Sequence, residues 1–335
     1  MQVTRINNRR YLGNKYRLLP FINDVITKEC GDFETFADIF AGTGAVSSSY
    51  TDKILYTNDI LYSNYLCHLT WFSDEPFDIT KIENYIEYFN SELPYEDNYM
   101  TENFSDTYFS RKNCSRIGFI RETIENEFKK DKINNRERAM LITSMLYGID
   151  KIANTCGHYD AYRKGVDFPE SFTMCVPEPN SNLKHNYCYN EDTNELVKNI
   201  IADVVYIDPP YNSRQYCDAY HLVENIARWE KPEVFGVAKK MDRAALKSKY
   251  CTRSAAAVFK DLIENLDAKY IVVSYNNMAN KGNDRSNAKI SDTQILETLK
   301  SKGMVKIYSE EFKAFTTGKS ERLDNEERLF VCRCN

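Results

Sequence analysis

A strand-like segment ends in Asp208, Pro209, Pro210 and Tyr211, residue types suited to binding a planar ring that carries an amine. The preceding run, IIADVVYI, is short and apolar, as in a buried strand. Proline lacks a backbone N–H and fixes φ, so the Asp208 carboxylate and the Pro209 carbonyl become rigid acceptors with few competing donors. These acceptors suit the two hydrogens of an exocyclic NH2 group, and Tyr211 offers a flat surface for stacking. The alternative is a proline-rich turn with an incidental tyrosine.

Acidic residues and glycines also close two earlier strand-like segments. FETFADIFAGTG, from Phe33, contains Asp38 and stops at Gly42 and Gly44, and KILYTND ends in Asp59. In α/β sheets, ligands bind beyond the carboxyl ends of the strands, and an acid after the second strand accepts ribose hydroxyls. A third glycine and a G-x-x-x-x-G-K-[ST] motif are both missing, so the sequence predicts a nucleoside ligand rather than a dinucleotide or triphosphate. An ordinary tight turn is the alternative.

The order of elements indicates an α/β protein whose sheet is parallel at its centre, as in Rossmann-like folds. A helix can begin at AVSSSYTDK. The sequence then predicts two strands, IIADVVYID and AKYIVVSYN, and two helices, YHLVENIARW and SAAAVFKDLIENL. It predicts a terminal strand pair from MVKIYSEEF and RLFVCRC. The alternation of strands and helices stops at residues 75–198, which are polar and tyrosine-rich and have apolar residues at helical spacing. We therefore predict a sheet domain of residues 1–74 and 199–335, interrupted by a helical domain of residues 75–198.

The net charge of −5 is unevenly distributed along the chain. Residues 1–17 carry five basic side chains and no acid, and residues 239–253 carry six basic side chains against Asp242 alone. A polyanion bound to one face would explain both blocks. Solvated helix faces are the alternative.

Composition also excludes several classes of protein. No apolar run approaches the ~18 to 20 residues of a membrane span, and no export signal follows the N-terminal charges, so we expect a cytoplasmic protein without a membrane partner. The ten cysteines include no C-x-x-C pair, which indicates reduced thiols rather than a zinc or thioredoxin-like site.

Taken together, these motifs resemble those of the DNA adenine-N6 methyltransferases that use S-adenosylmethionine (SAM). Their order is that of the Dam-like (alpha) subgroup, in which the SAM motifs come first and the target-recognition region precedes the catalytic tetrapeptide. The segments that carry the resemblance are YLGNKYRLLPFI (11–22), FADIFAGTGAV (36–46), TNDI (57–60), KIANTCGHYDAYRK (151–164), DPPYNSRQY (208–216) and IVVSYNN (271–277). The resemblance implies a SAM-binding methyltransferase sheet and assigns residues 75–198 as a target-recognition domain.

The resemblance also implies roles for individual residues. The residues implied for SAM are Tyr11 and Lys15 along the methionine moiety, Asp38 with Phe40, Gly42 and Gly44 at its amino acid end, Asp59 on the ribose and Ile60 against the adenine. Asp208, Pro209, Pro210 and Tyr211 are implied to hold the flipped substrate base. Asp38 stands where the family frequently has Glu, and either acid can meet an ammonium. The family also has a late aromatic residue that covers the other face of the base; Phe312 and Phe315 are candidates for it, with packing in the core as the alternative.

Several basic residues and one histidine are candidates for contact with DNA. They are Arg9, Arg10, Arg111, Arg116, His158 and Arg214. Arg111 and Arg116 lie at near-helical spacing, which fits phosphate contact or a solvated helix face equally. Sequence readout is expected from the inserted domain through the major groove.

The resemblance implies a site-specific enzyme that methylates the N6 amine of an adenine flipped out of duplex DNA, by direct transfer from SAM and without a metal. The enzyme would act alone or beside a cognate restriction endonuclease; its oligomeric state is open, and a monomer suffices. One alternative is an RNA or protein amine methyltransferase with the same core. Another is a non-catalytic DNA-binding module on this fold, which the intact strand-end acids and tetrapeptide oppose.

Overall fold

The structure, a computed structural model, describes residues 2–9, 11–169, 171–179, 184–276, 289–311 and 326–335. The chain forms two compact units, each assembled from three segments. The sheet unit consists of residues 14–60, 184–216 and 246–335, and the helical unit consists of residues 1–13, 61–183 and 217–245.

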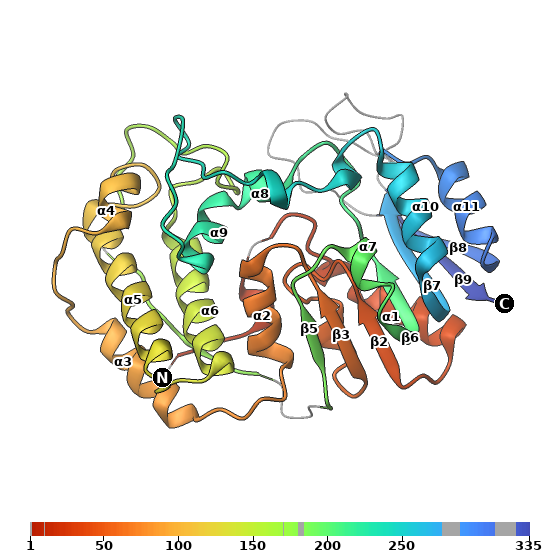
Figure 1. Ribbon diagram of the computed structural model, residues 1–335, viewed down its shortest axis with the longest axis horizontal. Coiled ribbons are helices and arrows are strands. Elements are labelled where there is room, and N and C mark those ends of the chain that lie inside the picture. Colours follow the sequence, from red (N-terminus) through yellow and green to blue (C-terminus); the bar gives the residue numbers. More distant parts are fainter. Residues whose placement is uncertain (1, 10, 170, 180–183, 277–288, 312–325) are drawn as a thin grey trace. The chain divides into compact units, whose positions relative to one another are not determined.

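The sheet unit contains a seven-stranded sheet that is mostly parallel (Figure 1). The strands are, in spatial order, β5 (Tyr187–Tyr189), β3 (Ile54–Asn58), β2 (Thr35–Asp38), β6 (Ile201–Ile207), β7 (Asp267–Asn276), β9 (Glu326–Cys334) and β8 (Gly303–Glu311). Strands β5, β3, β2, β6 and β7 run parallel, whereas β9 is antiparallel to both of its neighbours. The predicted α/β architecture and the predicted terminal strand pair are therefore confirmed.

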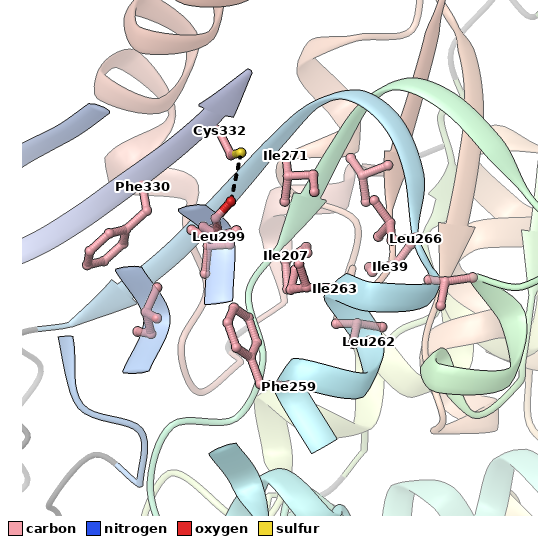
Figure 2. Close-up of a cluster of buried hydrophobic side chains, with 14 of the residues drawn as sticks. Ile39, Ile207, Phe259, Leu262, Ile263, Leu266, Ile271, Leu299, Phe330 and Cys332 are labelled. Carbon is pink, nitrogen blue, oxygen red and sulfur yellow. Dashed lines mark hydrogen bonds between the residues drawn. The ribbon is translucent and has the colours of Figure 1, made fainter. Parts of the chain in front are cut away.

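Helices of the sheet unit cover both faces of the sheet. They are α1 (Leu19–Cys30), α7 (Thr193–Leu196), α10 (Ala255–Asn265) and α11 (Asp292–Lys300). Figure 2 shows the core on one face, where Ile207 and Ile271 of the strands pack with Phe259 of α10 and Leu299 of α11. Val305 of β8 packs against this core, so the alternation of side chains along a strand places Lys306 on the opposite face.

Helix α1 packs at that opposite face. Lys306 and Tyr308 of β8 both donate to the Glu29 carboxylate of α1, the lysine at 2.7 Å. Because residues 306 and 308 share one face of their strand, both contacts place α1 on the side away from α10 and α11. Helices α10 and α11 on one face and α1 on the other therefore enclose this part of the sheet.

The helix expected at AVSSSYTDK is reduced to a single 3-10 turn, η3 (Ser47–Ser49). Serine hydroxyls compete with the helical backbone for hydrogen bonds. The Ser47 hydroxyl donates to Asp38 at 2.9 Å, and the Ser48 hydroxyl donates to the Ala45 carbonyl at 2.6 Å. The expectation of a longer helix is therefore wrong, and the serines instead support the end of β2.

The helical unit is organised around α6 (Asn135–Ile152), in which every residue from Arg136 to Ile149 is buried. A helix that is buried on all sides must be surrounded by other elements. These are α2 (Tyr62–Phe72), α3 (Ile79–Asn90), α5 (Arg111–Lys129), α9 (His221–Arg228) and the two-stranded sheet of β1 (Val3–Thr4) with β4 (Val176–Pro177). Helix α4 (Tyr99–Phe104) packs on α5, and α8 (Tyr216–Ala219) spans the boundary between the units.

The helical unit is larger than the predicted insertion of residues 75–198, because segments on both sides of that range pack into it. Helix α2 lies against α6, where the Thr70 hydroxyl donates to that of Thr143 at 2.9 Å. The buried Glu224 carboxylate of α9 accepts the amides of Tyr62 and Ser63 at the start of α2, at 2.8 and 2.9 Å. The central segment of the helical unit therefore begins near residue 61, and residues 184–198 of the predicted insertion, which form β5 and α7, belong to the sheet unit. Within the described ranges, no helix is both long and apolar enough to cross a membrane.

Candidate active site

Two glycines shape the turn that follows β2. Gly42 has φ 54° and Gly44 has φ 87°, a left-handed backbone that side chains other than glycine rarely adopt. The Gly42 amide donates to the Asp59 carboxylate at 3.0 Å, and the Ala41 amide donates to the Asn58 carbonyl at 2.9 Å. The turn is thereby fixed to the end of the neighbouring strand β3.

Asp38 closes β2 and is 1% exposed. One carboxylate oxygen, Oδ2, accepts the Ser47 hydroxyl at 2.9 Å, whereas Oδ1 is buried and has no hydrogen-bond partner among the described residues. The pKa of Asp38 is raised to about 7, mainly by burial, with Ser47 lowering it and the nearby carboxylates of Asp208 and Asp59 contributing to the rise. A buried anionic oxygen without a partner fits a ligand ammonium, such as the amino group of SAM.

Replacing Asp38 with asparagine is expected to stabilise the ligand-free protein at pH 8 more than at pH 5. The raised pKa means that the folded protein keeps a proton that the unfolded chain releases between about pH 4 and pH 7, so this group lowers stability as the pH rises through that window. Asparagine removes the buried charge and still accepts from Ser47, and the expected gain at pH 8 is on the order of 1 to 3 kcal/mol. Urea unfolding at both pH values measures it.

The control for this comparison is Asp52→Asn, because the Asp52 side chain is 68% exposed. An Asp38→Asn variant whose stability differs from wild type by the same amount at pH 5 and pH 8 would contradict the assigned cause. The same variant should also bind SAM more weakly, since the ammonium loses its anionic partner.

Asp59 and Ile60 follow β3, and the loop that follows β5 holds their backbone. The side-chain amide of Asn190 donates to the backbone carbonyls of Asp59 and Ile60, at 2.7 and 3.0 Å. The buried side-chain amide of Asn58 donates to the backbone carbonyls of Ile39 and Glu191, at 3.3 and 3.1 Å. Sequence reasoning missed both asparagines, and only Asn58, adjacent to the acid in TND, carried a local signal.

Asp208 follows β6 and lies beside two charged groups. Its carboxylate is 2.9 Å from the Lys15 ammonium, which is also 3.2 Å from the Glu327 carboxylate of β9. Burial raises the pKa of Asp208 to about 6, with Lys15 lowering it and Glu327 raising it. Burial alone would lower the pKa of Lys15, but the carboxylates of Asp208 and Glu327 outweigh it and hold that pKa well above its usual value. Glu327 was not among the predicted site residues.

The rest of the tetrapeptide is held by its surroundings. Pro209 is buried and Pro210 is half-buried. The Tyr211 carbonyl accepts the Lys289 amide at 2.8 Å, and its half-buried ring meets Tyr275 edge-on with centroids 6.1 Å apart. These contacts fix the turn that presents the Asp208 carboxylate.

Phe40 lies in the turn after β2, where its ring packs edge-on against Tyr250 with centroids 5.1 Å apart. Tyr11 belongs to the helical unit instead. Its ring stacks on that of Tyr220 with centroids 4.5 Å apart, and its hydroxyl accepts the side-chain amide of Asn64 at 2.9 Å. The structure thus brings together all the predicted SAM residues except Tyr11 within the sheet unit. Phe312 and Phe315 lie outside the described residues.

Two of the arginines proposed for DNA contact are bound within the helical unit. The Arg9 side chain is fully buried and donates to Asp150 at 2.8 Å. Arg116 donates to the Phe89 and Phe172 carbonyls, the second at 2.5 Å, and its guanidinium lies over the Phe172 ring. A phosphate would have to displace these partners, so both arginines stabilise the unit as it stands.

The other candidates are more accessible. Arg111 is half exposed and pairs with Asp97 at 2.7 Å. Arg214 is exposed in the loop after Tyr211, where its amide donates to the Asn212 side chain at 2.9 Å. His158 is half-buried, with Nδ1 accepting the Asp160 amide at 3.3 Å. Arg10 lies outside the described residues.

Comparison with known proteins identifies relatives of this chain. Residues 11–286 match the family model for D12 class N6 adenine-specific DNA methyltransferases. The chain is 35% identical over 293 residues to the modification methylase StsI of Streptococcus sanguinis, covering 80% of this chain and 44% of that protein. It is 30% identical over 344 residues to the modification methylase LlaI of Lactococcus lactis subsp. lactis, covering 96% and 53%.

A third relative is similar along its whole length. The type II methyltransferase M.NlaIII of Neisseria lactamica is 29% identical over 327 residues, which cover 93% of each protein. The chain spans about half the length of StsI and LlaI. Because the family model covers most of the sequence, including the glycine turn, Asp59 and the tetrapeptide, the chain belongs to the D12 class N6 adenine-specific DNA methyltransferase family.

Proposed function

We propose that this chain transfers a methyl group from SAM to the N6 amine of an adenine in a short sequence of duplex DNA. The observation that carries the proposal is the gathering of Asp38, Asp59 and Asp208 at the carboxyl ends of three adjacent parallel strands. The charges of Asp208 and Asp59 both raise the pKa of Asp38, so the three carboxylates lie within electrostatic reach of one another. This edge of an α/β sheet is the usual ligand-binding edge.

Within this proposal, the SAM residues act by charge and by backbone geometry. Asp38 offers its unpartnered oxygen to the ammonium, and Asp59, held against the Gly42 amide, accepts the ribose hydroxyls. Phe40, Gly42 and Gly44 form the turn along the amino acid end, with Ile60 against the adenine ring and Lys15 beside the methionine moiety. When bound, SAM supplies an electrophilic methyl group on a sulfonium.

The tetrapeptide would activate the substrate amine. The lone pair of adenine N6 is delocalised into the ring, which makes the amine a poor nucleophile. The Asp208 carboxylate and the Pro209 carbonyl accept its two hydrogens, turn the lone pair outward and stabilise the positive charge that develops on nitrogen. Tyr211 stacks on the ring. Because these groups cannot reach a base inside a duplex, the nucleotide must swing out, which costs a few kcal/mol.

The DNA partner and the biological setting are also part of the proposal. The helical unit, which holds residues 75–183 of the predicted recognition segment, would bind the duplex through Arg111 and His158. Arg214 of the sheet unit is a further accessible candidate for contact. Relatives named as modification methylases and type II methyltransferases favour a role in restriction-modification. We propose a cytoplasmic enzyme that acts without a metal, either beside a restriction endonuclease or alone.

Purified protein incubated with labelled SAM is expected to label duplex DNA, and digestion of that DNA should release N6-methyladenine. Structured RNA and a mixture of proteins serve as competing acceptors in the same assay. Label found only in RNA or only in protein would reject the DNA assignment. Modification-aware sequencing of DNA from cells that express the chain would then give the target sequence.

A further inference from the structure

The Lys15 ammonium is placed between two carboxylates that come from different strands. It is 2.9 Å from Asp208, which follows β6, and 3.2 Å from Glu327 of β9. The side chains of Lys15 and Glu327 are each 8% exposed, so neither is well solvated. Buried charges require close partners, and the two carboxylates share one cation.

Glu327 is itself fixed in position by the neighbouring strand. The Ser274 hydroxyl of β7 donates to Glu327 Oε1 at 2.6 Å, and Ser274 is fully buried. The antiparallel register places Asn276 opposite Glu327. The second carboxylate is therefore rigid, whereas Lys15 has a long and flexible side chain that can move between two acceptors.

The contact between Lys15 and Asp208 conflicts with the proposed chemistry. The ammonium occupies a hydrogen-bonding position on the carboxylate that the substrate amine must also use. A cation held there would also oppose the positive charge that develops on the amine nitrogen. Lys15 must therefore leave Asp208 when the base binds, and a buried ammonium can leave only towards another anion.

We propose that Glu327 is a positioning residue that receives the Lys15 ammonium when the base binds, so that Asp208 is free to accept a hydrogen from the substrate amine. This inference rests on the proposed methyltransferase function. The step moves an ammonium between two carboxylates and breaks no covalent bond. Without a base, Lys15 bridges both carboxylates and keeps Asp208 ionised.

The groups around Asp208 predict opposite pH effects for the two partners. Those that face it are Lys15 before η2 (Tyr16–Leu18), Glu327 on β9, Tyr206 on β6, Tyr211 in the following loop and Asp38 on β2. The pKa of Asp208 is raised to about 6, so the wild-type rate should fall as the pH drops through about 6. We call this fall in rate on the acidic side of the pH profile the acid limb. Removing the charge of Glu327 should move the acid limb to lower pH, and Lys15→Met should move it to higher pH.

The test compares wild type, Glu327→Gln, Glu327→Asp, Lys15→Met and the control Glu326→Gln across pH 5 to 8. Glu326 precedes Glu327 on β9, and its side chain points to the other face of the sheet. We expect Glu327→Gln to lower kcat/KM for duplex DNA by about 10- to 100-fold, as for a displaced catalytic group. Its acid limb should move to lower pH, with Glu327→Asp partly restored and Glu326→Gln unchanged.

A Glu327→Gln variant with an unchanged rate overturns the inference, and so does a reduced rate whose acid limb has not moved, which would indicate a structural role. If that variant does not fold, Glu327→Asp decides, because its shorter side chain withdraws the carboxylate from Lys15, and an unchanged kcat/KM in this variant overturns the inference. Calorimetric titration of each variant with SAM separates a lost cofactor site from a lost base site. Wild type that labels no DNA refutes the proposed function, whereas active wild type with an equally active Glu327→Gln refutes only the inference.

Discussion

Asp208→Ala is expected to lower the rate of methyl transfer by at least about 100-fold while SAM binding stays nearly unchanged. The variant removes the charged acceptor proposed to stabilise the transition state, whereas Asp38 and Asp59 remain in place. Folding should tolerate the change because Lys15 keeps its contact with Glu327 at 3.2 Å. Single-turnover transfer to duplex DNA, together with calorimetric SAM binding, measures both effects.

Asp208→Asn and Asp267→Ala are the matched comparisons for this prediction. Asparagine keeps one acceptor oxygen but no charge, so its rate should lie between those of wild type and the alanine variant. Asp267 is exposed at the start of β7, at the opposite edge of the sheet, and its replacement should have no effect. An alanine variant at position 208 that retains more than a tenth of the wild-type rate would remove Asp208 from the chemistry.

Replacing Asp59 with alanine is expected to weaken SAM binding by about 1 to 3 kcal/mol, the range for a hydrogen bond to a charged group. The change removes the acceptor proposed for the ribose hydroxyls. It also removes the partner of the Gly42 amide, which lies 3.0 Å from the carboxylate. Both losses weaken the binding of SAM, so the dissociation constant for SAM should rise while the rate at saturating SAM falls little.

Two further variants separate these contributions. Asp59→Asn can still accept from Gly42, so its remaining loss in affinity reports on the ribose contact. Asp52→Ala removes an exposed acid before β3 and should leave the dissociation constant unchanged. Equal SAM affinity in wild type and the Asp59→Ala variant would show that the ribose lies elsewhere.

The sequence was most informative where function depends on residues that are contiguous in the chain. Asp38, Asp59 and Asp208 each end a short apolar run, and parallel strands bring such ends to one edge of a sheet. The glycines at 42 and 44 were predictable as a turn for the same local reason. The sheet and the positions of these acids could therefore be predicted without coordinates.

Long-range pairing was not predictable from local patterns. Glu327 reaches Lys15 only because β9 inserts antiparallel between β7 and β8, and one unaligned sequence does not reveal that strand order. Asn190 likewise supports Asp59 only through the packing of β5 against β3. Neither residue stands beside a recognisable motif.

Charge alone was a poor guide to surface function. Arg9 belongs to a strongly basic segment, yet it is buried against Asp150. Arg116 lies at helical spacing with other basic residues, yet its guanidinium binds backbone carbonyls. The extent of the helical unit was missed for a related reason, since the packing of α2 and α9 on α6 depends on contacts across the chain.

Lys15 and Glu327 lie near opposite ends of the sequence but meet in one charge cluster. During synthesis on the ribosome, a chain that has not yet added β9 to its sheet would hold the lysine against Asp208 alone. Such a nascent chain would lack the second carboxylate that the proposed reaction needs. Methylation would therefore begin only after β9 has been synthesised and has docked, which would keep chains that lack this strand from marking DNA.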